Sequence, residues 1–584
     1  MRKKIFVILI VFIFLFSSLS INSYGIKTNN GNINNSKIYG FITNIGPFEN
    51  VRINKNKNCR TYNMINDLLR ENISVYWTSE DINLLVSQFN VSIKINKFFE
   101  KGAFIIPFTG IEKIDKKITV IMCDYNQTSE IEDNITTIPI YKILEKNDII
   151  SYKLSNVKII QITNKASSVE IWYFDNALCC GFLDIDLVEE KNLKEQLKND
   201  YNVLIWPGAA MPIEVIVYTV LSGLKIDSTS GIVRDFVSNG GGFLGSCYGS
   251  FIASSGVLPF PMYLKRRAYN PDLNSIGIFS LADFLTMPIK YVGDVNVRII
   301  NNSHPVVYGI DDEIIVDHFE YGSKIVFNSK TVEVIAEFDK GNSKLEGSPD
   351  YVSSKFGEGR IVTFGSHPEF NPNIENKIVS NSLFYITSKN KDIFEINHER
   401  NSTFFLEILE KTGDLRKKMN VQENRLDYIC HEINYTINCF SSYPENLYEY
   451  LIFYLKNDYY VLKTIDNLHK IESLSKLMDN DNKFNSDLEK IEDQIMALLN
   501  QAQISINKSS IYYKNFYKVY NFLGDFDENN TSIVSFIKKI IIRQFGKPFN
   551  NEFNILLLKC LYKCYFESTK FLRHYWYEYE SSII

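Results

Sequence analysis

The chain has 584 residues, which is too long for one ordinary domain and predicts about two to four. A hydrophobic content of 45% and a charged content of 22% are typical of folded globular proteins and exclude a largely disordered one. The 63 basic and 68 acidic residues give a net charge of −5, so the composition offers no electrostatic reason to bind nucleic acid or anionic lipid.

Residues 1–25 have the order of a secretory signal. Basic residues at 2–4 precede an apolar run over 5–16, and small polar residues follow up to Gly25. This run is shorter than the roughly 20 residues that a membrane span needs, although Leu19 and Ile21 could extend it into an uncleaved anchor. We therefore expect a secreted or membrane-anchored, extracytoplasmic protein that touches a membrane only through this segment.

A polar linker over 26–36 leads into a predicted small α/β domain over 37–155. Short β-type runs alternate there with a helical pattern, as in other α/β domains. The predicted strands include 73–77, 103–107 and 118–122, and a helix is predicted over 62–69.

Residues 157–388 show a stronger alternation of short apolar strands with helices. Such strands predict a parallel sheet that helices cover on both faces. The predicted strands are 157–162, 202–206, 243–244, 332–336 and 360–364, and the predicted helices are 193–197, 231–237 and 248–254.

A helical bundle is predicted over 395–584, where glycine and proline become sparse. Residues at 488, 491, 495, 498 and 502 are apolar and lie on one stripe of a helix, because their spacing alternates between three and four. Further helices are predicted over 404–419, 445–468 and 553–579. These helices are the part of the chain that could contact a protein partner.

The sequence Gly245-Ser246-Cys247-Tyr248-Gly249 sets a cysteine between a predicted strand and a predicted helix. A nucleophile on such a sharp turn has a strained backbone, and flanking glycines let the chain fold tightly beneath it. The N-terminus of the following helix favours a thiolate, and the backbone N–H of Tyr248 would stabilise an oxyanion. These features predict that Cys247 is a nucleophile.

A base and its orienting group are predicted at His367 and Glu369. The predicted strand over 360–364 leads directly into these residues, so they should reach the same edge of the sheet as Cys247. His367 would deprotonate the thiol, and Glu369 would orient the imidazole.

Three segments resemble class I glutamine amidotransferases. Residues 240–250 (GGGFLGSCYGS) resemble the nucleophile elbow of that family, and residues 357–369 (GEGRIVTFGSHPE) resemble its His-x-Glu segment. Residues 206–209 (WPGA) resemble the loop that supplies the second oxyanion donor. Among the subgroups of that family, the segments are most similar to the amidotransferase-like domain at the N-terminus of some biotin–protein ligases.

The resemblance implies a flavodoxin-like parallel sheet over 157–388. It also implies a catalytic triad of Cys247, His367 and Glu369, with an oxyanion hole from the backbone N–H groups of Gly208 and Tyr248. One departure concerns the oxyanion loop, because Ala209 stands where the family often has a second glycine, and alanine takes positive φ at a higher cost.

Metal and cofactor sites are not expected. The G-x-G-x-x-G pattern over 240–245 follows a predicted helix and contains the next strand, which is the wrong order for a dinucleotide site. His-x-Glu at 367–369 lacks the P-C-x-x-C partner of zinc deaminases. Cys560 and Cys564 share a helix face, and a Cys-His-Glu run at 430–432 lies on another predicted helix, but neither has further ligands.

Several other features leave alternatives open. Nine cysteines is an odd number, which in an exported protein indicates a free thiol, whereas the alternative is a set of buried core residues that includes Cys179 and Cys180. His318 or Glu320 could border a substrate pocket, whereas the alternative for His318 is a surface-loop or core histidine.

These observations predict an exported cysteine-dependent amide hydrolase. No synthetase or biotin ligase catalytic region is recognisable, so a small amide or peptide substrate is as consistent as glutamine. The alternative is a non-catalytic binding or assembly module on the same fold.

Overall fold

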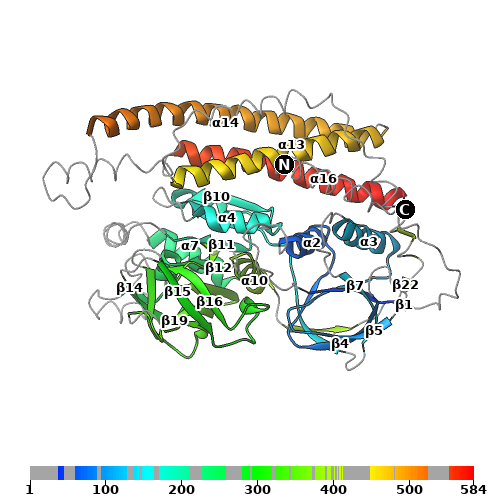
Figure 1. Cartoon of the computed structure of the whole chain (residues 1–584), viewed down its shortest axis with the longest axis horizontal. Helices are drawn as coiled ribbons and strands as arrows, with labels where there is room; N and C mark the ends of the chain where they lie inside the picture. The colour runs from blue at the N-terminus through cyan, green and yellow to red at the C-terminus, as the bar shows by residue number, and fades with distance from the viewer. Residues whose placement is uncertain are drawn as a thin grey trace, which may run out of the picture.

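The computed structural model arranges two β-containing parts side by side beneath a layer of three long helices (Figure 1). It describes residues 37–44, 59–87, 94–127, 137–143, 148–163, 170–208, 227–257, 279–289, 293–318, 322–340, 344–370, 375–388, 391–395, 400–401, 404, 407–408, 411, 448–478, 480–523 and 552–583. The predicted signal, the linker, Ala209, Glu320 and the Cys-His-Glu run at 430–432 lie outside these residues, as does most of the helix predicted over 404–419. Within them, no helix is long and apolar enough to cross a membrane.

The first part is an eight-stranded antiparallel sheet that carries two helices, α2 (Cys59–Arg70) and α3 (Glu112–Gln127). Its strands, in spatial order, are β21 (Lys391–Glu395), β8 (Asp148–Lys153), β3 (Tyr76–Thr78), β6 (Phe104–Pro107), β2 (Gly40–Thr43), β7 (Thr137–Ile143), β4 (Ile82–Ser87) and β5 (Lys94–Phe99). β22 (Arg400–Asn401) also pairs with β1 (Lys37–Ile38). The chain therefore returns to this part after completing the central one.

The prediction of a strand over 118–122 is wrong, because these residues lie inside α3. The side chain of Asp115 accepts hydrogen bonds from the backbone N–H groups of Thr109 and Gly110, at 2.7 and 3.1 Å, which fixes the start of the helix. Residues 118–123 are all fully buried, so this stretch has neither a polar face nor a helical stripe. A short apolar run with β-branched residues is ambiguous for this reason.

The central part is a nine-stranded sheet, and the predicted parallel arrangement holds for five of its strands. These are β10 (Ile185–Glu189), β9 (Ile159–Thr163), β11 (Val203–Trp206), β12 (Gly242–Ser246) and β20 (Gly359–Phe364). Numbered along the chain, their spatial order is 2-1-3-4-5, which is the order of flavodoxin-like sheets. Both faces of this half are covered, because alternate side chains of β11 belong to different buried clusters.

The other four strands depart from the predicted parallel sheet. They run antiparallel to their neighbours beyond β20, in the order β19 (Pro349–Phe356), β18 (Glu333–Phe338), β15 (Gly293–Ile299) and β16 (Glu313–His318). A two-residue turn joins β19 to β20, which is possible because the two strands are antiparallel and need no crossover helix. A separate small sheet contains β13 (Gly256–Val257), β14 (Phe284–Ile289) and β17 (Gly322–Asn328).

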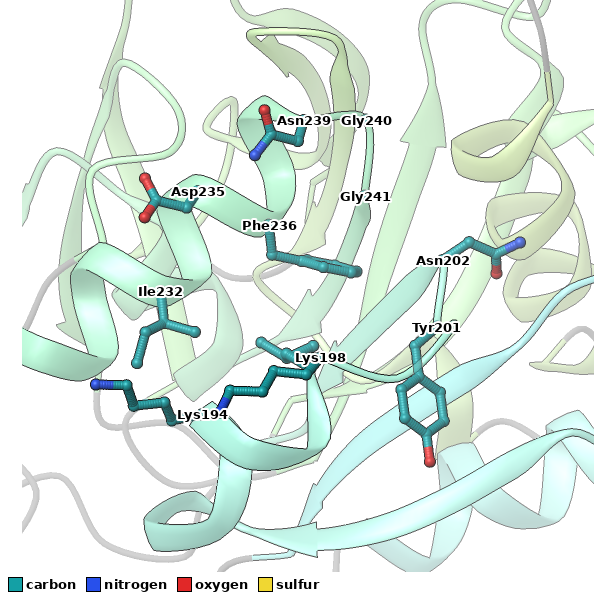
Figure 2. Close-up of a pocket in the computed structure, with 11 residues that line it drawn as sticks. Lys194, Lys198, Tyr201, Asn202, Ile232, Asp235, Phe236, Asn239, Gly240 and Gly241 are labelled. Atoms are coloured by element: carbon teal, nitrogen blue, oxygen red, sulfur yellow. The ribbon is translucent and has the colours of Figure 1, made fainter.

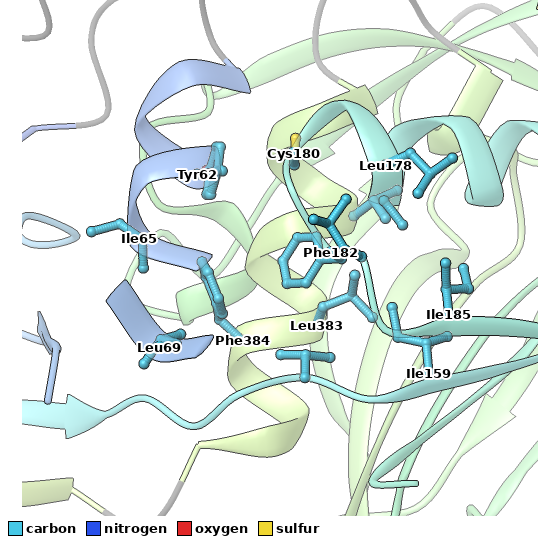
Figure 3. Packing of buried hydrophobic residues seen from close by; sticks show 14 of the residues in the cluster. Tyr62, Ile65, Leu69, Ile159, Leu178, Cys180, Phe182, Ile185, Leu383 and Phe384 are labelled. Atoms are coloured by element: carbon cyan, nitrogen blue, oxygen red, sulfur yellow. The ribbon is translucent and has the colours of Figure 1, made fainter. Parts of the chain in front are cut away.

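Side chains of α2 pack directly against the central part. The hydroxyl of Tyr62 donates to Oδ1 of Asn381 at 2.9 Å, and both residues are buried. Asn381 lies on α10 (Glu375–Thr387), which covers one face of the parallel strands. Figure 3 shows the apolar cluster around this contact, which includes Tyr62, Ile65, Leu69, Ile159, Leu178, Phe182, Ile185, Leu383 and Phe384.

The helical layer consists of α13 (Tyr448–Leu477), α14 (Asn482–Leu523) and α16 (Glu552–Ile583). The predicted stripe on α14 is largely buried, with Leu499 replacing Leu498 as the fully buried leucine. α16 contacts the central part, where the hydroxyl of Tyr562 donates to the carbonyl of Leu183 at 2.8 Å. It also contacts the first part, where Arg573 pairs with Asp67 on α2 at 2.5 Å.

His304 is a buried neutral histidine in the central part. Its Nδ1 accepts a hydrogen bond from the N–H of Val306 at 3.3 Å, and its Nε2 lies 3.0 Å from the hydroxyl of Ser353. Burial lowers the pKa of His304 from 6.5 to about 3, and the positive charge of Arg360 adds to this effect. Between about pH 3 and pH 6.5, this histidine therefore binds a proton more readily in the unfolded chain than in the folded chain.

We expect this histidine to make the fold less stable in acid. The stability that the neutral histidine contributes is fully present above pH 6.5 and is lost as the pH falls toward 3. At pH 5 the free energy of unfolding should be lower by roughly 2 kcal/mol on this account. Urea unfolding of the wild type and of His304→Gln at pH 7.5 and pH 5 checks this, because the variant should lose less stability on acidification. Equal losses in the two proteins would contradict the expectation.

Candidate active site

Cys247 lies between the end of β12 and the start of α8 (Tyr248–Ala253). Its backbone has φ 50° and ψ −103°, which is a strained conformation for a residue with a side chain. Its N–H donates to the carbonyl of Phe364 at 2.9 Å, at the end of the neighbouring strand β20. The residue as a whole is 5% exposed. A tightly held turn therefore presents the cysteine at the carboxyl edge of the parallel strands.

The two glycines of the motif are required by close backbone contacts. A Cβ atom on Gly249 would lie 2.0 Å from the carbonyl oxygen of Trp206, the last residue of β11. A Cβ atom on Gly245 would lie 2.9 Å from the backbone of Gly249. Because both contacts involve the main chain, no rotation of a side chain could relieve them.

His367 and Glu369 follow β20, and both are buried. Nδ1 of His367 lies 2.7 Å from Oε1 of Glu369. Burial by itself lowers the pKa of His367, but interactions with the Glu369 carboxylate and the Cys247 side chain raise that pKa to about 10. Since Glu369 occupies Nδ1, Nε2 is the ring nitrogen left for Cys247. The imidazole is therefore a cation at neutral pH, held beside the Glu369 carboxylate and the Cys247 sulfur.

Asp350 on β19 supports the turn that carries His367. Its carboxylate accepts from the N–H and from the hydroxyl of Ser366, both at 2.7 Å, and its carbonyl accepts from the N–H of Gly365 at 3.0 Å. Burial raises the pKa of Asp350 to about 7, although these hydrogen bonds oppose the shift. The turn thus has little freedom to move relative to β19.

Sequence reasoning did not find three buried side chains that contact the predicted triad or its support. Ser246 donates from its hydroxyl to Oε1 of Glu369 at 2.6 Å, Asn176 donates to the carbonyl of Glu369 at 2.8 Å, and Asp350 holds Ser366. No local pattern marks Asn176 or Asp350. Ser246 was visible only as the variable position of the G-x-C-x-G motif.

The predicted oxyanion donors are only partly described. Gly208 is the second residue after β11, and Tyr248 is the first residue of α8. His318 ends β16, which is the last strand on the antiparallel side of the sheet, and its side chain lies outside the described residues. The part of the chain that the structure describes contains no group of three side chains arranged to hold a metal ion.

A surface hollow of about 560 Å³ lies elsewhere, between α5 (Leu193–Gln196) and α7 (Asp227–Ser238) (Figure 2). Its lining includes Asn202, directly before β11, and Gly241, directly before β12. The hollow therefore faces the amino ends of the parallel strands, whereas Cys247 follows the carboxyl end of β12. Flavodoxin-like sheets bind their ligands at the carboxyl ends.

The fold and the site define a class of protein. It is an α/β domain of flavodoxin-like strand order with a cysteine, a histidine and a glutamate gathered at the carboxyl edge of its parallel strands.

Comparison with known proteins adds little to this description. No family model and no curated protein matches the chain. A ThuA-like protein from Bacteroides uniformis is 16% identical over 40% of this chain and 93% of that chain, with a TM-score of 0.28. A cytoplasmic protein from Salmonella typhimurium is 15% identical over 40% and 100%, with a TM-score of 0.26. A glutamine amidotransferase from Thermotoga maritima is 12% identical over 39% and 96%, with a TM-score of 0.25. Scores this low establish neither a family nor an activity.

Proposed function

We propose that the central part is a cysteine-dependent amide hydrolase of the class I glutamine amidotransferase-like kind, nearest by its motifs to the N-terminal domain of biotin–protein ligases. One observation carries the proposal. Cys247 on its strained turn and the His367–Glu369 pair come from separate segments, yet they interact in a buried cluster. Strained nucleophiles next to an oriented imidazole are typical of covalent catalysis.

In the proposed reaction, the Cys247 thiolate attacks the carbonyl carbon of an amide, and the carbonyl electrons move to its oxygen. Backbone N–H groups of Gly208 and Tyr248 would stabilise that oxyanion. His367 gives its Nε2 proton to the nitrogen as the C–N bond breaks, which leaves a thioester and a free amine. His367 then deprotonates a water molecule that attacks the thioester and releases the acid.

The raised pKa of His367 supports the first half of this reaction, because a protonated imidazole at neutral pH can supply the proton that the leaving amine needs. The substrate is proposed as a small amide or peptide, with glutamine as one member of that group. The signal-like residues 1–25 support an extracytoplasmic location, which cell fractionation and sequencing of the mature N-terminus test.

A non-catalytic module is the second candidate, and the low exposure of Cys247 favours it. The 5% exposure leaves little room for an amide carbon to reach the sulfur without some opening of the site. In that case the helical layer would contact a partner protein.

Alkylation of Cys247 tests the two candidates. We expect iodoacetamide to modify Cys247 at pH 7 faster than it modifies a denatured-chain thiol, with the modified site identified by peptide mass spectrometry. His367→Asn should slow the reaction roughly 30-fold, because an ordinary thiol is only a few per cent ionised at pH 7. Amide hydrolysis in a substrate screen should disappear in Cys247→Ala and persist in Cys180→Ala, which removes another buried cysteine of the same part. If wild-type Cys247 reacts no faster than a denatured thiol, the hydrolase proposal fails.

A further inference from the structure

The hydroxyl of Ser246 is bound to the acid of the proposed triad. Ser246 is the last residue of β12 and is fully buried, and its hydroxyl donates to Oε1 of Glu369 at 2.6 Å. The same oxygen lies 2.7 Å from Nδ1 of His367. Oε1 of Glu369 is therefore in contact with both groups, and one of them belongs to the residue directly before Cys247.

This arrangement fixes the orientation of the Glu369 carboxylate about its terminal side-chain torsion. The terminal torsion of a glutamate is broad and nearly two-fold, so the backbone alone does not select which oxygen faces a partner. Oε2 of Glu369 has no hydrogen-bond partner among the described residues. Asn176 of α4 (Glu170–Cys179) holds only the main-chain carbonyl of Glu369. Besides His367, the Ser246 hydroxyl is thus the one described group that donates to the carboxylate.

We propose that Ser246 is a positioning residue of the proposed active site, whose hydroxyl fixes the Glu369 carboxylate so that the His367 ring keeps Nε2 directed at Cys247. This inference rests on the proposed function. The physical reason is that a charge-assisted O–H···O⁻ bond in a buried site is short and directional, so it restrains rotation of the acceptor. Because Ser246 and Cys247 are adjacent, one strand end sets both the sulfur and the carboxylate.

Among the residues that the structure describes, the other titratable groups near this carboxylate are Tyr173 of α4 and Tyr351 and Asp350 of β19. Burial raises the pKa of each tyrosine well above 10, so both hydroxyls stay neutral across the experimental range. Asp350, with a pKa of about 7, titrates within that range. The effect of Asp350 titration on the pH profile of Cys247 alkylation is common to the wild type and to Ser246 variants. A difference between their profiles therefore reports the effect of Ser246.

The test is the pH profile of Cys247 alkylation by iodoacetamide in the full chain, between pH 5 and 10. Ser246→Ala should move the midpoint of the profile upward by about one unit and slow alkylation roughly tenfold below the midpoint, since one unit corresponds to a factor of ten. Ser250→Ala is the matched control, because it removes another buried hydroxyl from the same elbow, one that accepts a hydrogen bond from Ser323, which lies outside the triad. Its profile should match the wild type.

A double-mutant cycle separates positioning from simple loss of packing. In a Glu369→Gln background, Ser246→Ala should shift the profile no further, because the carboxylate through which it acts is gone. An equal shift in both backgrounds, or a wild-type profile in Ser246→Ala, overturns the inference while leaving the hydrolase proposal intact. A wild-type Cys247 no more reactive than a denatured thiol would instead sink the proposed function itself.

Discussion

Asp67→Ala should destabilise the protein by about 3 kcal/mol, because Asp67 is a buried carboxylate with four donors. It lies on α2 and is 1% exposed, with Arg70 and Arg573 on Oδ1. The hydroxyls of Tyr125 and Tyr577 donate to Oδ2 at 2.5 and 3.0 Å. Removing the carboxylate leaves two guanidinium groups and two hydroxyls without their common partner.

The loss should be felt first at α16, since Arg573 and Tyr577 anchor this helix to the first part. Urea unfolding should show the lower free energy of unfolding. Hydrogen exchange should show that the mutation increases the exchange rate more in α16 than in β12. Asp200→Ala is the matched control, because Asp200 pairs with Lys158 and is 92% exposed. Exposed pairs contribute about 0.5 kcal/mol or less. A loss at Asp67 as small as that at Asp200 would contradict the role given to this cluster.

Gly249→Ala should lower the free energy of unfolding by about 3 kcal/mol, because the added methyl group overpacks the elbow. This is the upper end of the usual cost of overpacking. The new methyl group would lie 2.0 Å from the Trp206 carbonyl oxygen, so α8 must move away from β11. A displacement of about 1 Å near a reacting group can lower its rate roughly 100-fold. We therefore expect Cys247 alkylation to fall by this factor even in the molecules that remain folded.

Gly231→Ala provides the comparison. Gly231 lies inside α7, and no described atom comes within 4 Å of a Cβ atom built there. Alanine should stabilise the helix by about 0.5 to 1 kcal/mol and leave Cys247 alkylation unchanged. If Gly249→Ala behaves like Gly231→Ala, the tight packing of the elbow against β11 is not what holds Cys247 in its conformation.

Local patterns were sufficient for much of the central part. Short apolar runs predicted β9, β11, β12 and β20, because strands buried on both faces are mostly apolar and lack the regular polar alternation of a half-exposed strand. The elbow was visible for a different reason. Its glycines at 245 and 249 are dictated by backbone contacts that only glycine permits, so the requirement is written into the sequence itself.

Local patterns were insufficient where distant segments meet. The run over 118–122 was assigned to a strand because burial of a whole helix stretch removes its periodicity. The antiparallel half of the sheet was also missed, since the direction of a strand depends on its partner and not on its own residues.

The sequence by itself determined the strained cysteine turn, the strand that precedes His367 and the long helices of the C-terminal region, because each depends on residues within one short segment. Only the tertiary structure decided which groups surround Glu369 and Asp67. Ser246 is 123 residues from Glu369, and Arg573 is 506 residues from Asp67. Buried polar groups take whichever partners the packed elements bring to them, and that choice is made by strand order and helix docking, which no local spacing records.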